Sequence, residues 1–71
     1  MMQLTRSLQS KVDEALEQIV REQLEVVVVR GTSGMKLVRD GTAAAEERRQ
    51  RPGCCITVIS VTDGTFILCH S

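Results

Sequence analysis

Hydrophobic residues in the first third of the chain recur at steps of three and four residues, with charged residues between them. This spacing places the apolar side chains along one face of a helix. Glu17 and Arg21 stand four residues apart, in the order that favours an ion pair on a helix surface. We therefore expect an amphipathic helix over about 5–23 that packs on a core. The apolar positions are Leu4, Leu8, Val12, Ala15, Leu16 and Ile19.

The pattern changes after Leu24, where four valines follow one another at 26–29. Such a β-branched run disfavours a helix and is typical of a strand. Two glycines in the stretch 31–34 then interrupt the chain, and apolar residues resume at 35–39. We expect a β-hairpin over about 25–39 with a four-residue loop.

The stretch from Thr42 to Arg51 is rich in alanine, glutamate and arginine and has high helix propensity. Thr42 is a candidate N-cap, and Pro52-Gly53 would end the helix. Because the stretch has no sizeable apolar side chain, it predicts a short solvent-side helix or a linker over 42–53.

The last third predicts a second hairpin over 54–70. Asp63-Gly64 lies between two β-branched runs, which is a strong signal for a two-residue turn. Alternate residues of a strand share a face. Both faces of this hairpin are apolar, and no charged residue lies within its strands. One face carries Val61, Phe66, Ile59 and Leu68; the other carries Ser60, Ile67, Val58, Cys69 and Ile56.

Counting outward from each turn gives a register for each hairpin. In the first hairpin, Val28 is expected opposite Leu37, which also sets Glu25 opposite Asp40 as a mildly repulsive pair. In the second hairpin, a turn at Asp63-Gly64 sets Val58 opposite Cys69 and Thr57 opposite His70.

Together these elements predict a single small α+β domain over 1–71, in the order α-β-β-(α)-β-β. The N-terminal amphipathic helix packs on a small antiparallel sheet of two β-hairpins. A second apolar face on the last hairpin implies that another chain or another layer covers it. We assign Val58, Ile67 and Cys69 to this interface. The expected core residues are Ile59, Val61, Phe66, Leu68 and Leu16.

Composition and charge narrow the classes of partner. The formal net charge is zero, which argues against binding to nucleic acid or to an anionic membrane and permits self-association. A single phenylalanine is the only aromatic residue, so the chain has no platform for stacking bases. No stretch approaches the roughly 18 apolar residues that a membrane span needs. We expect a protein partner or a second copy of the chain.

Three cysteines without a ladder of spacings argue for reduced thiols and a cytoplasmic protein. The alternative compartment is an organelle. The first twelve residues carry Arg6 and Lys11 and no acid, a pattern that resembles an organellar presequence.

Thiols and an imidazole gather in the last hairpin without forming a metal site. Neighbours on a strand point to opposite faces, so neither Cys54 with Cys55 nor Cys69 with His70 can hold one ion. In the expected register Cys54 and Cys69 lie about 13 Å apart, beyond the reach of a disulfide. Cys55 and His70 share a face but have no acid nearby. We therefore predict no catalytic residue, no metal and no cofactor.

Three resemblances suggest functions. The order helix–hairpin–helix–hairpin resembles the front of roadblock-type dimerisation modules, and a helix before strands resembles Sm-like RNA-binding rings. Cysteines among Ser and Thr, behind an amphipathic helix, resemble lanthipeptide precursors. We predict a small non-enzymatic protein–protein interaction or oligomerisation module. The alternatives are a Ser/Thr-Cys crosslinked, lanthipeptide-like precursor with residues 54–71 as its core, and a small RNA-binding β-rich module.

Overall fold

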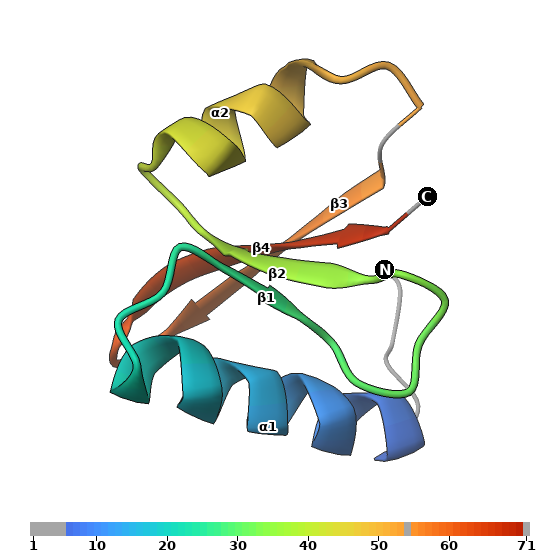
Figure 1. Ribbon diagram of the computed structural model, residues 1–71, viewed down its shortest axis with the longest axis vertical. Helices are drawn as coiled ribbons and strands as arrows, with labels where there is room; N and C mark the ends of the chain where they lie inside the picture. The colour runs from blue at the N-terminus through green and yellow to red at the C-terminus, as the bar shows by residue number, and fades with distance from the viewer. Residues whose placement is uncertain (1–5, 54, 71) are drawn as a thin grey trace.

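A computed structural model describes residues 6–53 and 55–70. It has the predicted α+β class, with one antiparallel sheet between two helices (Figure 1). The strand order is β1-β2-β4-β3, so the two hairpins join through β2 and β4. The elements are α1 (Arg6–Arg21), β1 (Val26–Val28), β2 (Lys36–Arg39), α2 (Ala43–Gln50), β3 (Cys55–Val61) and β4 (Gly64–His70).

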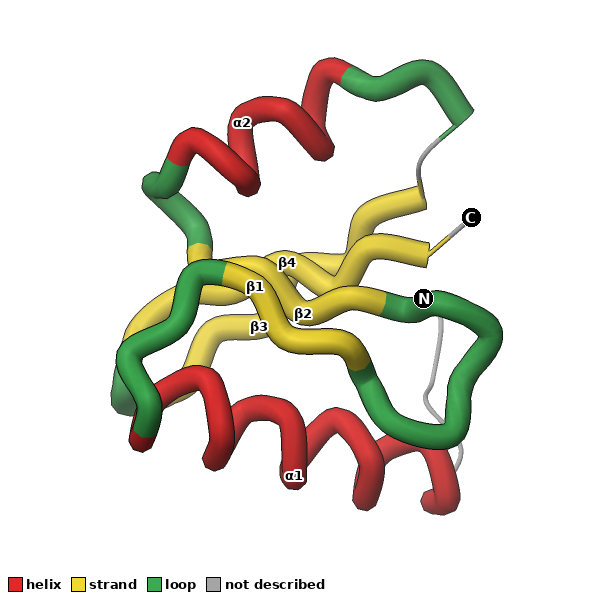
Figure 2. Tube along the Cα trace, in the orientation of Figure 1, coloured by secondary structure: helices red, strands yellow, loops and turns green. Residues whose placement is uncertain are grey.

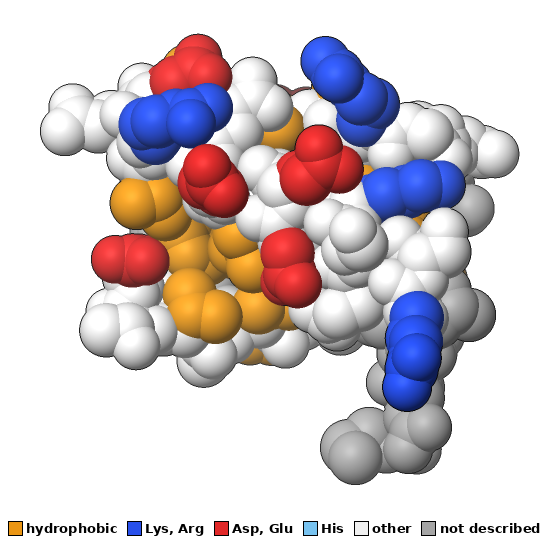
Figure 3. Space-filling view, turned by 90° about the horizontal axis from the view of Figure 1, so that it is seen from below, with side chains coloured by type: hydrophobic (Ala, Val, Ile, Leu, Met, Phe, Trp, Pro, Cys, Tyr) orange, Lys and Arg blue, Asp and Glu red, His pale blue; other side chains and the backbone are white. Residues whose placement is uncertain are grey.

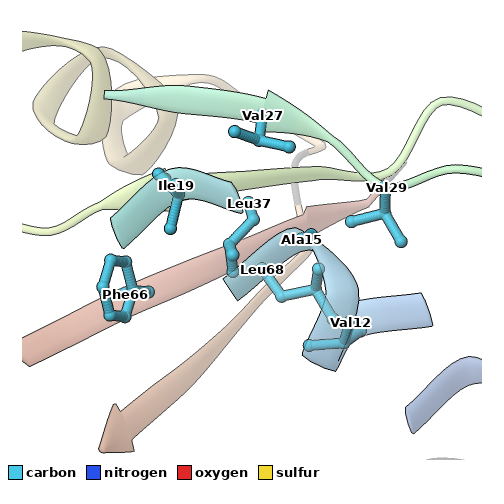
Figure 4. Packing of buried hydrophobic residues seen from close by; sticks show 8 residues of the cluster. All are labelled: Val12, Ala15, Ile19, Val27, Val29, Leu37, Phe66 and Leu68. Carbon is cyan, nitrogen blue, oxygen red and sulfur yellow. The ribbon is translucent and has the colours of Figure 1, made fainter. Parts of the chain in front are cut away.

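The main core lies between α1 and the sheet (Figure 4). Helix α1 contributes side chains at intervals of three and four residues, as the apolar periodicity predicts. These side chains pack on residues of β1, β2 and β4 that share the lower face of the sheet. Position 5, the expected start of the helix, lies outside the described residues. The buried cluster consists of Val12, Ala15, Ile19, Val27, Val29, Leu37, Phe66 and Leu68.

The helix option for 42–53 is confirmed, but α2 covers the opposite face of the sheet rather than lying wholly in solvent (Figure 2). The Thr42 hydroxyl accepts a hydrogen bond from the Ala45 amide at 3.3 Å, so the predicted N-cap is confirmed. Ala45 is buried against Val38 and Ile67. Alanine suffices here because its small side chain lets the helix backbone approach the strands closely.

The first hairpin differs from the expected register by one residue. Val27, not Val28, lies opposite Leu37. The backbone carbonyl of Glu25 accepts a hydrogen bond from the amide of Arg39, so the expected pairing of Glu25 with Asp40 is wrong. A slip of one residue exchanges the two faces of a strand. Val27 is therefore buried, and Val28 is 59% exposed.

The cause of this slip is the side chain of Thr32. Its hydroxyl donates a hydrogen bond to the carbonyl of Val29 at 2.7 Å and accepts one from the amide of Met35 at 3.2 Å. The amide of Val29 also donates to the carbonyl of Met35 at 2.9 Å. The loop is thus closed by Val29 and Met35 and is one residue longer than expected.

The second hairpin is shifted by two residues from the expected register. Val58 lies opposite Ile67 rather than Cys69, and the turn residues between the strands are Thr62 and Asp63. Gly64 has φ 133°, a backbone conformation that favours glycine. Because side chains alternate with period two, this shift leaves every residue on its predicted face.

Helix α1 ends in a hydrogen-bonded cap with a non-glycine residue in the left-handed region. The amide of Leu24 donates to the carbonyl of Ile19 at 3.1 Å, and the amide of Gln23 donates to the carbonyl of Val20 at 3.3 Å. This is the pattern of a Schellman motif, in which glycine is the usual residue at the position of Gln23. Gln23 has φ 54°. Its backbone is therefore strained.

We expect Gln23→Gly to raise the free energy of unfolding by about 0.5–1 kcal/mol, because glycine adopts this φ without the penalty of a Cβ. Denaturant unfolding followed by circular dichroism measures the change. The matched control is Gln18→Gly on the exposed side of α1, which should lower stability by about 1 kcal/mol. If both variants lose stability, Gln23 is not strained.

Candidate functional site

The seven residues of β3 form one edge of the sheet, and we call them the β3 edge. Strand β3 pairs with β4 on one side, and no described strand lies on its other side. The strand contains no charged residue and no proline. Natural sheets usually protect a long edge with such residues, because unpaired N–H and C=O groups otherwise accept another strand. An edge of this kind is a candidate interface.

The backbone groups that point outward can be identified from the ladder. The amide of Asp40 donates to the carbonyl of Thr65 at 3.0 Å, so the backbone groups of Thr65 face β2. These groups alternate along an antiparallel strand, so those of Phe66 face β3 and bond Ile59 opposite. Alternation along β3 then turns the backbone groups of three residues outward. These residues are Ile56, Val58 and Ser60.

The side chains of the β3 edge are apolar or weakly polar on both faces of the sheet. Val58 is 56% exposed on the α2 side, and Val61 is 42% exposed on the α1 side. Ile59 is half-buried against the main core, as are Leu16 and Val20 of α1. Seen from the α1 side, hydrophobic side chains reach the surface as a patch bordered by acidic ones (Figure 3). Helix α1 thus leaves Val61 of β3 partly uncovered.

Two of the predicted interface residues are buried within the chain. Ile67 is 0% exposed and packs against Ala45 of α2, and Cys69 is 6% exposed. Val58 is the predicted interface residue that remains accessible. The covering layer inferred for the second face of the hairpin is therefore α2, over β4. What stays uncovered is the edge strand next to it.

The predicted core, four residues of the second hairpin and Leu16 of α1, is partly correct. Phe66 and Leu68 are fully buried, whereas Leu16 and Ile59 are half-buried at the margin of the core. Val61 is exposed, because it lies at the end of an edge strand, next to the turn. Burial therefore falls from β4 to β3.

The opposite edge of the sheet, β1, is built differently. It has three residues and lies beside a groove of about 640 Å³ between this strand and α1. Side chains of both charges line the groove, among them Lys11, Glu14 and Arg21. A short edge beside charged side chains is a poorer template for another strand. Val28 is its exposed apolar residue.

The shifted register brings Cys55 opposite His70, a pairing that the expected turn had placed at Thr57. Asp40 lies beside Thr65, five residues or about 17 Å along β4 from His70, so it is out of reach of this pair. Within the described residues, no group of three or more His, Cys, Asp or Glu is placed to hold a metal ion.

Cys69 is disulfide-bonded, contrary to the expectation of reduced thiols. Disulfides are rare in the reducing cytosol, so this bond removes the main support for a cytoplasmic protein. The expected separation of Cys69 from Cys54 concerns a residue outside the described ones. It rested on a register that was two residues wrong.

Two arginines at α2 and its C-terminal end are paired with acidic side chains. Arg49 pairs with Asp40 at 3.1 Å, and Arg51 pairs with Glu47 at 3.1 Å. A small hollow of about 260 Å³ near the end of α2 is lined in part by Lys36, Arg48 and Arg51. The two ion pairs neutralise Arg49 and Arg51.

Arg39 is the structurally important residue that sequence reasoning missed. Its guanidinium donates to the carbonyl of Ile19 at 2.9 Å and to that of Leu24 at 3.3 Å. It also lies 5.3 Å from the centre of the Phe66 ring. The available signal was the alternation of β2, which puts Arg39 on the same face as the buried Leu37.

None of the helices that the structure describes is both long and apolar enough to cross a membrane. Comparison of the chain with protein-family models, with curated proteins and with solved structures finds no significant match.

Proposed function

We propose that this chain is a small non-enzymatic interaction module that works by self-association. The observation that carries the proposal is the β3 edge, which combines seven residues, outward-pointing backbone groups and uncharged side chains. Burying the exposed valines Val58 and Val61 would add apolar contact to the backbone hydrogen bonds. A second copy of the chain is a partner that is present wherever the first copy is, at the same concentration.

The same geometry gives weaker support to the other functions. A nucleic-acid surface would need a cluster of unpaired basic residues, and Arg39, Arg49 and Arg51 are engaged within the chain, which leaves Lys36 and Arg48 at the hollow beside α2. A crosslinked peptide would need the Ser, Thr and Cys residues of the last segment to be accessible to an enzyme. The folded hairpin instead holds Cys69 in a disulfide.

Light scattering of the purified chain at micromolar concentration tests this proposal, and we expect a dimer. Association also couples to folding, so a hundredfold rise in concentration should raise the unfolding midpoint by roughly 10 °C or more. A non-reducing gel should show that the dimer is not covalent. A monomer with a concentration-independent unfolding midpoint would reject the proposed function.

A further inference from the structure

We infer that two copies join through their β3 edges as antiparallel strands, with the two-fold axis at Val58. This inference rests on the proposed function and specifies its interface. It assigns a partner, a second copy of this chain, and a register. The two four-stranded sheets would become one sheet of eight strands, with both α1 helices on one face and both α2 helices on the other.

The register follows from the outward-pointing backbone groups. In an antiparallel pair, two residues exchange N–H···O bonds when the backbone groups of both face the partner strand. A two-fold axis at Val58 pairs Val58 with Val58 of the second copy, Ile56 with Ser60 of the second copy, and Ser60 with Ile56 of the second copy. These three pairs exchange two bonds each, about six in all. Shifting the axis by one residue leaves Ile56 or Ser60 without an outward-pointing partner within Cys55–Val61.

The side chains of the strand suit this arrangement. A charged residue near the axis would lie close to the same residue of the second copy, and like charges opposite one another destabilise a sheet. The β3 edge carries none. On the α2 side, the exposed Val58 would meet Val58 of the second copy. On the α1 side, Ile59 would lie opposite Thr57 of the second copy.

The β1 edge offers less to a second copy. By the same alternation, Val26 and Val28 point their backbone groups outward, which gives two pairs rather than three within the strand. Glu25 precedes the strand, Arg30 follows two residues after its end, and the groove beside it is lined by charged side chains of α1. The two edges can therefore be distinguished by matched substitutions.

The decisive experiment uses opposite charges at the axis. Val58→Lys should raise the dimer dissociation constant at least about tenfold, because two lysines would face each other across the axis. Val58→Glu should do the same. An equimolar mixture of the two variants should recover a dimer, because the lysine of one copy then faces the glutamate of the other. Light scattering and native mass spectrometry of the mixture measure this recovery.

Val28→Lys is the matched control, because Val28 has the same side chain and nearly the same exposure, 59% against 56%. It should leave the dimer intact. If Val28→Lys dissociates the dimer and Val58→Lys does not, the β1 edge is the interface, and the inference fails while the proposed function stands. If neither variant dissociates it, both edges are excluded and the inference fails. A monomeric wild type rejects the proposed function itself.

Amide exchange in the unmodified chain provides a second test that needs no variant. The amides of Ile56, Val58 and Ser60 should exchange slowly at high concentration and become at least about tenfold faster on dilution below the dissociation constant. The amide of Ile59, which is bonded within the hairpin, should change less. Equal protection of the outward and inward amides at all dilutions would overturn the register.

Discussion

Phe66→Ala should leave much of the chain unfolded at room temperature. Phe66 is fully buried and is the only aromatic residue in the chain. Truncating a buried phenylalanine costs about 3–5 kcal/mol, from lost burial and from the cavity that remains. Domains of this size have little stability to spare. Urea unfolding followed by circular dichroism should show a lower midpoint or no native baseline.

Phe66→Leu is the control for this prediction, because it keeps most of the apolar volume and should cost less than about 1.5 kcal/mol. Val61→Ala, at an exposed position of the same hairpin, should change stability by less than about 0.5 kcal/mol. Phe66→Ala with an unchanged midpoint would show that the ring does not organise the core between α1 and the sheet.

Arg39→Ala should lower the free energy of unfolding by about 2–4 kcal/mol. The half-buried guanidinium donates hydrogen bonds to the carbonyls of Ile19 and Leu24, where α1 ends and β1 approaches, and lies over the Phe66 ring. Charge-assisted hydrogen bonds of this kind are stronger than neutral ones. Removing the side chain loses both bonds and its packing on the ring. Denaturant unfolding of the purified variant measures the loss.

Arg39→Lys should recover only part of this stability, because an ammonium group cannot reproduce the two-pronged contact of the guanidinium. Arg21→Ala is the matched control. The Arg21 side chain is 67% exposed and pairs with Glu17 on the surface of α1, so its removal should cost less than about 0.5 kcal/mol. Equal losses in Arg39→Ala and Arg21→Ala would reject the role of Arg39 in joining α1 to the sheet.

Local patterns predicted the fold class because each element carries its own periodicity. The spacing of Val12, Ala15 and Ile19 places them on one face of α1, and alternation placed every residue of the second hairpin on its correct face. That assignment is correct even though the predicted register was wrong by two residues, because a shift of two residues leaves each side chain on the same face. In the first hairpin, an error of one residue put the side chains of β1 on the wrong faces. The hydrogen bonds of Thr32 close a loop that is one residue longer than the positions of Gly31 and Gly34 suggest.

The long-range arrangement could not be read from these patterns. Nothing local to β2 or β4 indicates that they pair with each other, and this pairing is what leaves β3 at the edge. The packing of α2 through Ala45 was missed because a single small side chain gives almost no hydrophobic signal. For the candidate site, sequence reasoning therefore identified the uncharged strand but assigned the interface to a face that α2 covers in part, whereas the structure exposes the edge beside it.

If two copies join as proposed, the difference in length between β3 and β1 would decide how far the assembly could grow. Two copies that pair by a two-fold axis at β3 use up the same surface on each other, so the contact is isologous and closes on itself. The sheet that results would end on both sides in β1, with three residues flanked by charge. Its ends are poor seeds for a further strand. In the proposed assembly, one long unguarded edge per copy would therefore limit growth to pairs, whereas two such edges per copy would allow fibres.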